Sequence, residues 1–451
     1  MKLNIELLGS SFYYTLNRVA LKLFEVLSLW LLVKLLPKEQ IAFIGIAMGF
    51  IALLNILNIL PYRRIFKSFE EVNKRFSDHL SSYIVFWFLQ STLMLGIALI
   101  TAFFYVQSGF AQEIFLVMTG LSIAFLFGNL QLLFQEMFFV KLKQKTATIF
   151  NLISMVVFLG SLALLLFYPS IELYVSLIIL KAVLTCAGFF LLSKKEIGFV
   201  FRIASDWKKL LKDALAEFAV FDHLIGAFIE IITKSYLFVL GFFVAYTIAP
   251  DYYTIVIADY TIALLMVNLL TFFPLIIYRV SMLAMTRVST KEGLEKVLSA
   301  FTKYSAIFSL VQLVIFAALL NPLLSFFTDG NIGNSELFAL VLGIGTTVFN
   351  IGLPIHATAV LKSSIADYFK KIIFPVTLLS VAAYFFVSAF FEPVWIGIVY
   401  IFAAVAVNAL AYLHVKRNVG ISLQKVFFYA EEKEAIDHVL EKLGLKKEIR
   451  K

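Results

Sequence analysis

The sequence has little of what a soluble or secreted protein of its length carries. A single cysteine, Cys186, occurs among the 451 residues, which excludes an internal disulfide framework. The five histidines are scattered and form no cluster with metal-ligand spacing, so we expect no metal site and no other cofactor. Charged residues make up only 15% of the chain and hydrophobic residues 61%, a balance that excludes a water-soluble domain of this size.

Long apolar runs are what the sequence does contain. Runs of about 20 residues recur from end to end, and each is long enough to cross a bilayer as a helix. They are continuous rather than alternating, which excludes a transmembrane β-barrel. We predict an all-α polytopic membrane protein with twelve transmembrane helices, at 9–36, 40–62, 79–106, 113–140, 147–168, 171–193, 218–246, 252–278, 303–327, 336–361, 369–391 and 393–414. No cleavable signal pattern precedes the first span, which is expected to act as an uncleaved signal.

Basic residues gather in alternate connections between these spans. They lie in 63–78, 141–146, 194–217, 279–302 and 362–371, whereas the other connections carry almost none, with Lys38 as the exception. The positive-inside rule therefore places both termini in the cytoplasm, with the protein in the cell membrane. The net charge of +9 follows from this topology, and it favours contact with membrane lipids over binding of nucleic acid. Every predicted outer connection is short, which leaves no outer domain for an active site, so we expect no enzyme.

The chain contains an internal repeat. At a constant offset of 213 positions, three pairs of residues match without a gap: Pro37 with Pro250, Asn55 with Asn268, and Pro61 with Pro274. Six spans per half keep the two halves in the same orientation, as in parallel-repeat transporters. We therefore predict two six-helix lobes, 1–193 and 218–414.

Two segments outside the lobes have amphipathic patterns. The connector 194–217 has an apolar face with basic residues opposite, which is typical of a helix lying on the inner leaflet. The tail 415–451 has a similar apolar face and is predicted to form a cytoplasmic surface helix.

Charged side chains lie inside two of the apolar spans. In the first span Arg18, Lys22 and Glu25 share a helical face at i, i+4 and i+7, and in the seventh Glu230 and Lys234 lie at i and i+4. Each ionised group at mid-bilayer costs about 2.5–3.5 kcal/mol on insertion scales. These groups must therefore pair with one another or face a polar cavity.

Lys181 adds a third such position, near the centre of the sixth span, where a lysine cannot easily reach either surface. The embedded cations exceed Glu25 and Glu230 by two, and such a surplus suits an anionic guest such as a diphosphate headgroup. We assign substrate contact to the four cations, Arg18, Lys22, Lys181 and Lys234. Because carboxylates can titrate or bind a cation, we assign ion coupling to Glu25, Glu230 and Asp259.

Five uncharged or weakly basic polar residues inside the spans are candidates to line a cavity: Asn55, Asn268, Gln131, Gln135 and His356. For the two asparagines, hydrogen bonding between helices is the simpler interpretation.

Three segments of the sequence carry a resemblance to a known family. Leu35 to Glu39 follows the first span, Gln135 to Asn151 covers the junction of the fourth and fifth, and Gly241 to Tyr260, with Pro274 and Thr290 to Gly293, covers the seventh to ninth. Together with two six-span halves and a basic linker, they resemble the multidrug/oligosaccharidyl-lipid/polysaccharide (MOP) exporter superfamily, in particular its Wzx-type O-antigen and capsule flippases. The resemblance implies a monomeric flippase for an oligosaccharide on a polyprenyl diphosphate carrier, working by alternating access through a cationic cavity, with H⁺ or Na⁺ as the candidate coupling ion.

Other functions stay open from the sequence. A multidrug exporter of the same superfamily predicts a carboxylate-rich, aromatic cavity for organic cations, and the cationic surplus argues against it. A membrane-embedded polyprenyl-linked glycosyltransferase or polymerase commonly needs a large outer loop with catalytic acids or bases, and none is predicted. The sequence does not separate a flippase from a lipid scramblase or a non-transporting scaffold.

Overall fold

The structure is a computed structural model that describes residues 17, 20, 24, 26–28, 30–59, 75–108, 110–141, 143–215, 217–246, 250–288, 290–328 and 330–421. All secondary structure within these residues is helical, because a helix pairs its backbone groups internally, as lipid surroundings require. The chain divides into two compact units, Met1–Thr261 with Phe327–Asp329, and Ile262–Phe326 with Gly330–Lys451.

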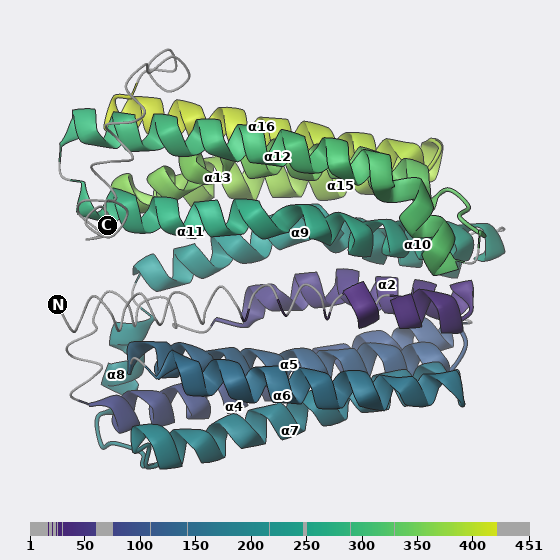
Figure 1. Ribbon diagram of the computed structural model, residues 1–451, viewed down its shortest axis with the longest axis horizontal. Helices are drawn as coiled ribbons and strands as arrows, with labels where there is room; N and C mark the ends of the chain where they lie inside the picture. The colour runs from purple at the N-terminus through teal and green to yellow at the C-terminus, as the bar shows by residue number, and fades with distance from the viewer. Residues whose placement is uncertain are drawn as a thin grey trace, which may run out of the picture. The chain divides into compact units, whose positions relative to one another are not determined.

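The first unit holds most of the helices before the boundary in α10. They are α2 (Lys38–Leu54), η1 (Asn55–Leu57), α4 (Phe76–Gln107), α5 (Glu113–Val140), α6 (Gln144–Leu162), η3 (Ala163–Leu166), α7 (Ile171–Ile197), α8 (Trp207–Ala214), α9 (Glu217–Tyr246) and most of α10 (Pro250–Val267). Helix α5 packs along α4 and α7 (Figure 1). Helix α9, which the sequence assigns to the second lobe, packs here with α2. The predicted lobes at 1–193 and 218–414 rest on the sequence repeat and stay a prediction.

The second unit holds the remaining helices. They are η4 (Asn268–Thr271), α11 (Phe272–Arg287), α12 (Lys291–Thr328), α13 (Ser335–Lys362), α14 (Ile365–Tyr368), the π-helical turn η5 (Phe369–Ile373), α15 (Phe374–Phe390) and α16 (Val394–Val419). Helix α13 packs along α16 and α11.

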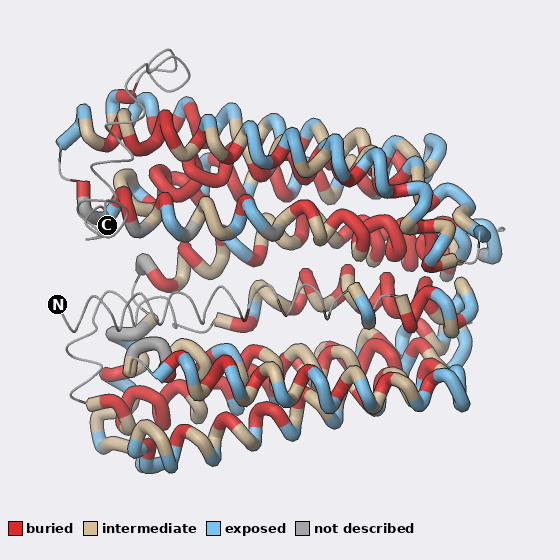
Figure 2. Tube along the Cα trace, viewed as in Figure 1, coloured by how far each residue is buried: buried red, intermediate tan, exposed pale blue. Residues whose placement is uncertain are grey.

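Eleven helices of the described residues are long and apolar enough to cross a membrane. They correspond to the second to twelfth predicted spans, whereas most of the predicted first span, 9–36, lies outside the described residues. Figure 2 shows exposed residues recurring along α12. The large apolar side chains of Val314 and Leu319 on this helix are exposed. Lipid contact accounts for such exposure, since water would make it costly. The fold class predicted from the sequence, an all-α polytopic membrane protein, is confirmed.

Helix bounds differ from the prediction at two spans. The eighth span, predicted at 252–278, is α10 with η4 and ends at Thr271, and a separate helix, α11, follows. The ninth, predicted from 303, begins at Lys291, because the polar turns that precede its apolar run are also helical.

The linker contains less helix than predicted. Helix α7 continues to Ile197 and ends at Gly198, whose φ of 66° lies in the left-handed region that glycine adopts without strain. Residues 198–206, called the strap below, are not helical, and only Trp207–Ala214 form α8. Of the predicted tail 415–451, the first residues continue α16 to Val419, and those after Ile421 lie outside the described residues.

Both halves of the repeat break their helix at the same position. Helix α2 ends at Leu54 and α10 at Val267, and a 3₁₀ turn begins at Asn55 and at Asn268. The offset between the two breaks is again 213 positions, so the local structure repeats with the sequence.

Glycines bring α2 close to its neighbours in the first unit. A Cβ added at Gly49 would lie 2.6 Å from the backbone nitrogen of Phe238 on α9, and one added at Gly45 would overlap Thr261 on α10. Small residues of this kind let membrane helices approach backbone to backbone. The α2–α9 contact therefore places the polar end of α2 against the charged turn of α9.

Apolar packing forms the core of the rest of this unit. Leu31, Phe158, Leu162, Leu165 and Leu177 make one cluster from the first span, α6, η3 and α7. The lone cysteine, Cys186, is buried on α7.

Candidate functional site

A charged pair on α9 lies at the centre of the candidate site. Lys234 donates a short hydrogen bond to Glu230 one turn before it, and both side chains are 26% exposed. The second carboxylate oxygen of Glu230 accepts a 2.6 Å hydrogen bond from the Asn55 amide of η1. The helix break at Asn55 thus supplies a donor to a carboxylate that lies within an apolar helix.

His223 extends this group by one further contact. Its Nε2 lies 2.8 Å from the backbone oxygen of Asn55, and because a carbonyl only accepts, Nε2 carries the proton. Asn55 is therefore held at its backbone by His223 and at its side chain by Glu230, so the end of α2 is fixed to two turns of α9.

A second ion pair joins α2 to α10. The Lys38 ammonium lies 3.0 Å from Asp259, whose side chain is 1% exposed. A buried carboxylate needs such a partner, because leaving it unpaired would cost several kcal/mol. Lys38 was the topological exception in the sequence, and this contact gives it a structural role. Two of the predicted coupling carboxylates, Glu230 and Asp259, are thus both paired with lysines.

Lys181 lies between aromatic rings. Its ammonium is 5.0 Å from the ring centroid of Phe24 and 4.9 Å from that of Phe158, within the range of cation–π attraction. The surrounding residues are the apolar cluster of α6 and α7. These two rings offset part of the cost of holding the charged ammonium of Lys181 in the middle of an apolar span.

A chain of amides links three helices of the first unit. Gln131 on α5 donates to Asn151 on α6 at 3.2 Å, and Asn151 donates to Asn17 at 2.8 Å. Asn17 and Asn151 are buried, so this chain links three helices in the way expected of interhelical hydrogen bonds. Gln135, one turn beyond Gln131, is half-buried.

His356 belongs to a separate network in the second unit. Asn408 on α16 donates its amide to the backbone oxygen of Val348, so its side-chain oxygen accepts from His356 Nε2 at 2.8 Å. The other ring nitrogen, Nδ1, then accepts a short hydrogen bond from the Tyr368 hydroxyl. Every polar atom of the His356 ring is satisfied, which is typical of a structural histidine. Asn268, also in this unit, is half-buried at the start of η4.

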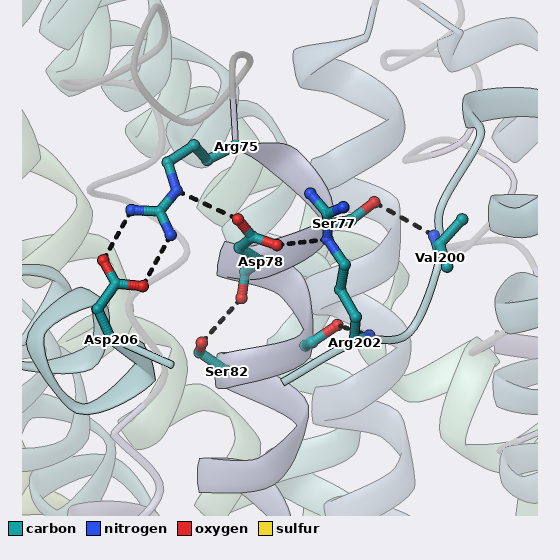
Figure 3. Close-up of polar contacts among 8 residues, drawn as sticks. Arg75, Ser77, Asp78, Ser82, Val200, Arg202 and Asp206 are labelled. Carbon is teal, nitrogen blue, oxygen red and sulfur yellow. Dashed lines mark hydrogen bonds and ion pairs between the residues drawn. The ribbon is translucent and has the colours of Figure 1, made fainter. Parts of the chain in front are cut away.

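Four charged residues tie the strap and α8 to the start of α4 (Figure 3). Arg75 donates two hydrogen bonds to Asp206, of 2.8 and 2.7 Å, and one of 3.1 Å to Asp78. Arg202 of the strap donates to the other oxygen of Asp78 at 2.6 Å. We call these four residues the latch. The hydrogen bonds from Arg75 lower the pKa of Asp206 to about 2, so the latch is fully ionised at neutral pH.

Three of the predicted site residues, Arg18, Lys22 and Glu25, lie outside the described residues. Sequence reasoning missed Lys38, His223 and Asn408 as partners of the predicted residues. A polar residue within or beside an apolar run is the signal that all three share. Within the described part of the chain, no three His, Cys, Asp or Glu side chains are grouped to hold a metal ion.

Solved structures of two transporter families have a similar fold. The chain aligns with an inward-facing multidrug resistance transporter of the MATE family, in the MOP superfamily, at a TM-score of 0.65 and 14% identity, over 90% of this chain and 99% of that one. It aligns with the lipid II flippase MurJ, in an inward closed conformation, at a TM-score of 0.61 and 15% identity, over 96% of this chain and 92% of that one. A eukaryotic MATE transporter gives a TM-score of 0.53 at 13% identity, over 97% and 98%.

No family model matches the sequence, and no curated protein does. The structural likeness nevertheless extends over nearly the full length of the chain and of each transporter. The chain therefore has the same fold as these transporters, which bears out the superfamily resemblance at the level of the fold, whereas the Wzx-type branch stays a prediction.

Proposed function

We propose that this protein is a transporter that flips an oligosaccharide linked to a polyprenyl diphosphate carrier across the cell membrane. The observation that carries the proposal is the Glu230–Lys234 pair: two partly exposed, opposite charges within an apolar helix of a chain with a transporter fold. Such residues in membrane helices mark substrate or ion pathways. The fold is shared with a lipid flippase and is therefore compatible with a lipid-linked substrate, and the excess of embedded cations in the sequence favours an anionic headgroup over an organic cation.

At the Glu230–Lys234 pair, an exchange of ionic partners would couple binding of the substrate to binding of the coupling ion. An incoming diphosphate competes with Glu230 for the Lys234 ammonium, because both are oxyanions that accept the same hydrogen bonds. Once displaced, Glu230 keeps the hydrogen bond from the Asn55 amide and becomes a base for H⁺ or a ligand for Na⁺. Arg18, Lys22 and Lys181 would add positive charge for the headgroup, and Glu25 and Asp259 remain further coupling candidates.

The alternating-access cycle follows from this exchange. In this cycle a polar, water-filled cavity replaces the hydration of the sugar headgroup, while the polyprenyl tail stays in the bilayer. The remaining polar candidates, Asn55, Asn268, Gln131, Gln135 and His356, would serve this cavity directly or by holding its helices. Membrane lipids are the other partners, and a monomer suffices for the cycle.

The direct test reconstitutes the protein in vesicles with a fluorescent lipid diphosphate sugar and measures its movement between leaflets. We expect movement to require the protein and to fall at least tenfold when Lys22, Lys181 and Lys234 are changed to glutamine together. Lys416→Gln, an exposed lysine at the end of α16, is the matched control and should leave the rate unchanged. Intact movement in a correctly folded triple variant would refute the cationic substrate site.

Export of an organic cation is the second candidate function. It is favoured by the fold similarity to MATE transporters. The Lys38–Asp259 and Lys234–Glu230 pairs leave the predicted excess of two embedded cations unchanged, because each pair contains one charge of either sign. The two functions differ in their response to Glu230→Gln. An exporter would lose binding of the organic cation itself, whereas a flippase would still bind the diphosphate and lose only its dependence on the ion gradient.

Catalysis is the least supported function. The described connections that lie opposite the linker in the predicted topology are short, with residues 108–112, 167–170 and 391–393 joining successive spans. A membrane-embedded glycosyltransferase or polymerase would transfer or hydrolyse the labelled glycan in the vesicle assay. Detection of free or elongated sugar would therefore refute the flippase proposal in favour of an enzyme.

A further inference from the structure

The strap that follows α7 carries exposed apolar side chains beside cations. Val200, Phe201 and Ile203 are 60%, 45% and 56% exposed, and Arg202 between them is 63% exposed at its side chain. Three exposed, large apolar side chains within four positions outside a helix are unusual on a surface that faces water. The contacts and charges around the strap indicate that these side chains face lipid rather than water.

The strap is held firmly in this exposed position. The backbone N–H groups of Val200 and Arg202 donate to the hydroxyls of Ser77 and Ser81, one turn apart on α4, at 3.2 and 3.0 Å (Figure 3). Phe199 is buried against Phe76 and Phe190, with ring centroids 6.4 and 5.9 Å apart. The exposed side chains are therefore presented by a fixed backbone, rather than by a loop that could fold them inward.

Positive charge surrounds the strap. From residue 194 to 215 there are six basic side chains, Lys194, Lys195, Arg202, Lys208, Lys209 and Lys212, against three acidic ones, Glu196, Asp206 and Asp213. Asp206 is bound by Arg75, and Arg75 also shares Asp78 with Arg202, so the latch is neutral as a whole. Lys194, Lys195, Lys208 and Lys209 are exposed and lie beyond the latch.

We propose that the strap is a docking surface for anionic phospholipid in the leaflet on the linker side of the membrane. Val200, Phe201 and Ile203 enter the boundary between headgroups and acyl chains, and the exposed lysines Lys194, Lys195, Lys208 and Lys209 bind the lipid phosphates. Apolar residues interleaved with basic ones are typical of segments that lie in an anionic interface. The latch contributes by holding the strap against α4 at the level where that helix enters the membrane.

The test uses full-length protein in vesicles with a fluorophore on a cysteine introduced by Ile203→Cys. Phospholipids that carry a nitroxide in the acyl chain quench it on contact, and the nitroxide is placed either on phosphatidylglycerol or on phosphatidylcholine at equal mole fraction. We expect at least twofold stronger quenching by the phosphatidylglycerol label. The combined Lys194→Gln and Lys195→Gln variant, which leaves the latch intact, should bring the ratio toward one.

Lys416→Gln with Arg417→Gln, two exposed cations at the end of α16, is the charge-matched control and should keep the wild-type ratio. Equal quenching by both lipids in wild-type protein would overturn the anionic preference. Quenching by aqueous iodide with none by either lipid would overturn the docking itself and place the strap in water. These outcomes do not depend on transport, so they stand apart from the proposed function.

Discussion

Asn55 and Asn268, 213 positions apart, each begin a 3₁₀ turn where an apolar helix ends. The two turns have the same local structure but contact different groups. Asn55 gives its amide to the Glu230 carboxylate, and in the second unit the backbone oxygen of Leu270, within the turn that Asn268 begins, accepts from Asn350 at 3.1 Å. The first break meets a charged group on α9, while the second is closed by an amide from α13.

The Glu230–Lys234 pair should behave as a unit. Glu230→Gln or Lys234→Met alone leaves the other charge unpaired within the membrane, whereas the double variant leaves none. We therefore expect each single variant to lower the apparent melting temperature in detergent more than the double variant does. Additive losses in this double-mutant cycle would show that the two charges do not depend on each other.

Gly49 should be intolerant of a side chain. Gly49→Ala places a methyl group against the backbone of Phe238, so α2 and α9 must separate, and we expect a loss of about 1–3 kcal/mol of stability. Gly96→Ala is the matched control, since nothing lies within 4 Å of its added Cβ. That change should be neutral or stabilising, because alanine favours a helix over glycine by about 1 kcal/mol. Comparison of their thermal unfolding checks the prediction, and equal effects would contradict it.

Asn408 should matter more than its neutral character suggests. Asn408→Leu leaves Nε2 of the buried His356 without its acceptor, at a cost of about 1–3 kcal/mol. Asn418→Leu, at the exposed end of the same helix, removes only hydrogen bonds to His414 that water can replace, and should cost less than about 0.5 kcal/mol. Thermal unfolding of the two variants, with wild type alongside, provides the measurement. A similar small loss in both would remove the argued role of the network.

The latch should be insensitive to pH across the physiological range. Because Arg75 lowers the pKa of Asp206 to about 2 from its usual value of 3.8, the stability it contributes is complete above about pH 4 and is lost as the pH falls toward 2. Hydrogen exchange of the strap amides, corrected for intrinsic rates, should be constant from pH 8 to pH 5. Asp206→Asn should raise that exchange severalfold at every pH, and unchanged protection would show that the serine contacts alone hold the strap.

Local patterns in the sequence predicted the features that depend on neighbouring residues. Hydropathy located the second to twelfth spans, and the spacing of Glu230 and Lys234 placed them on one helical turn, where they pair. The repeat marked Asn55 and Asn268, which proved to be equivalent helix breaks.

Contacts between distant segments were beyond the reach of one sequence. Lys38 and Asp259 are separated by 221 positions, and Asp78 meets Arg202 across 124, so neither pairing leaves a local pattern. The strap was predicted as helix because its apolar and basic residues fit that period. Its backbone is held by serines of α4, a contact that leaves no pattern in the sequence. The end of α7 at Gly198 is a local glycine cap, which the helical period alone does not reveal.

The burial of Cys186 makes the native chain a ready background for spectroscopy. A thiol enclosed by α7 and its neighbours is shielded from water-soluble maleimides and methanethiosulfonates while the protein is folded. Pairs of cysteines introduced at surface positions of the two units can then be spin-labelled without first removing the native residue. Distances between such labels, measured with and without a lipid diphosphate sugar, would test whether the two units move relative to one another.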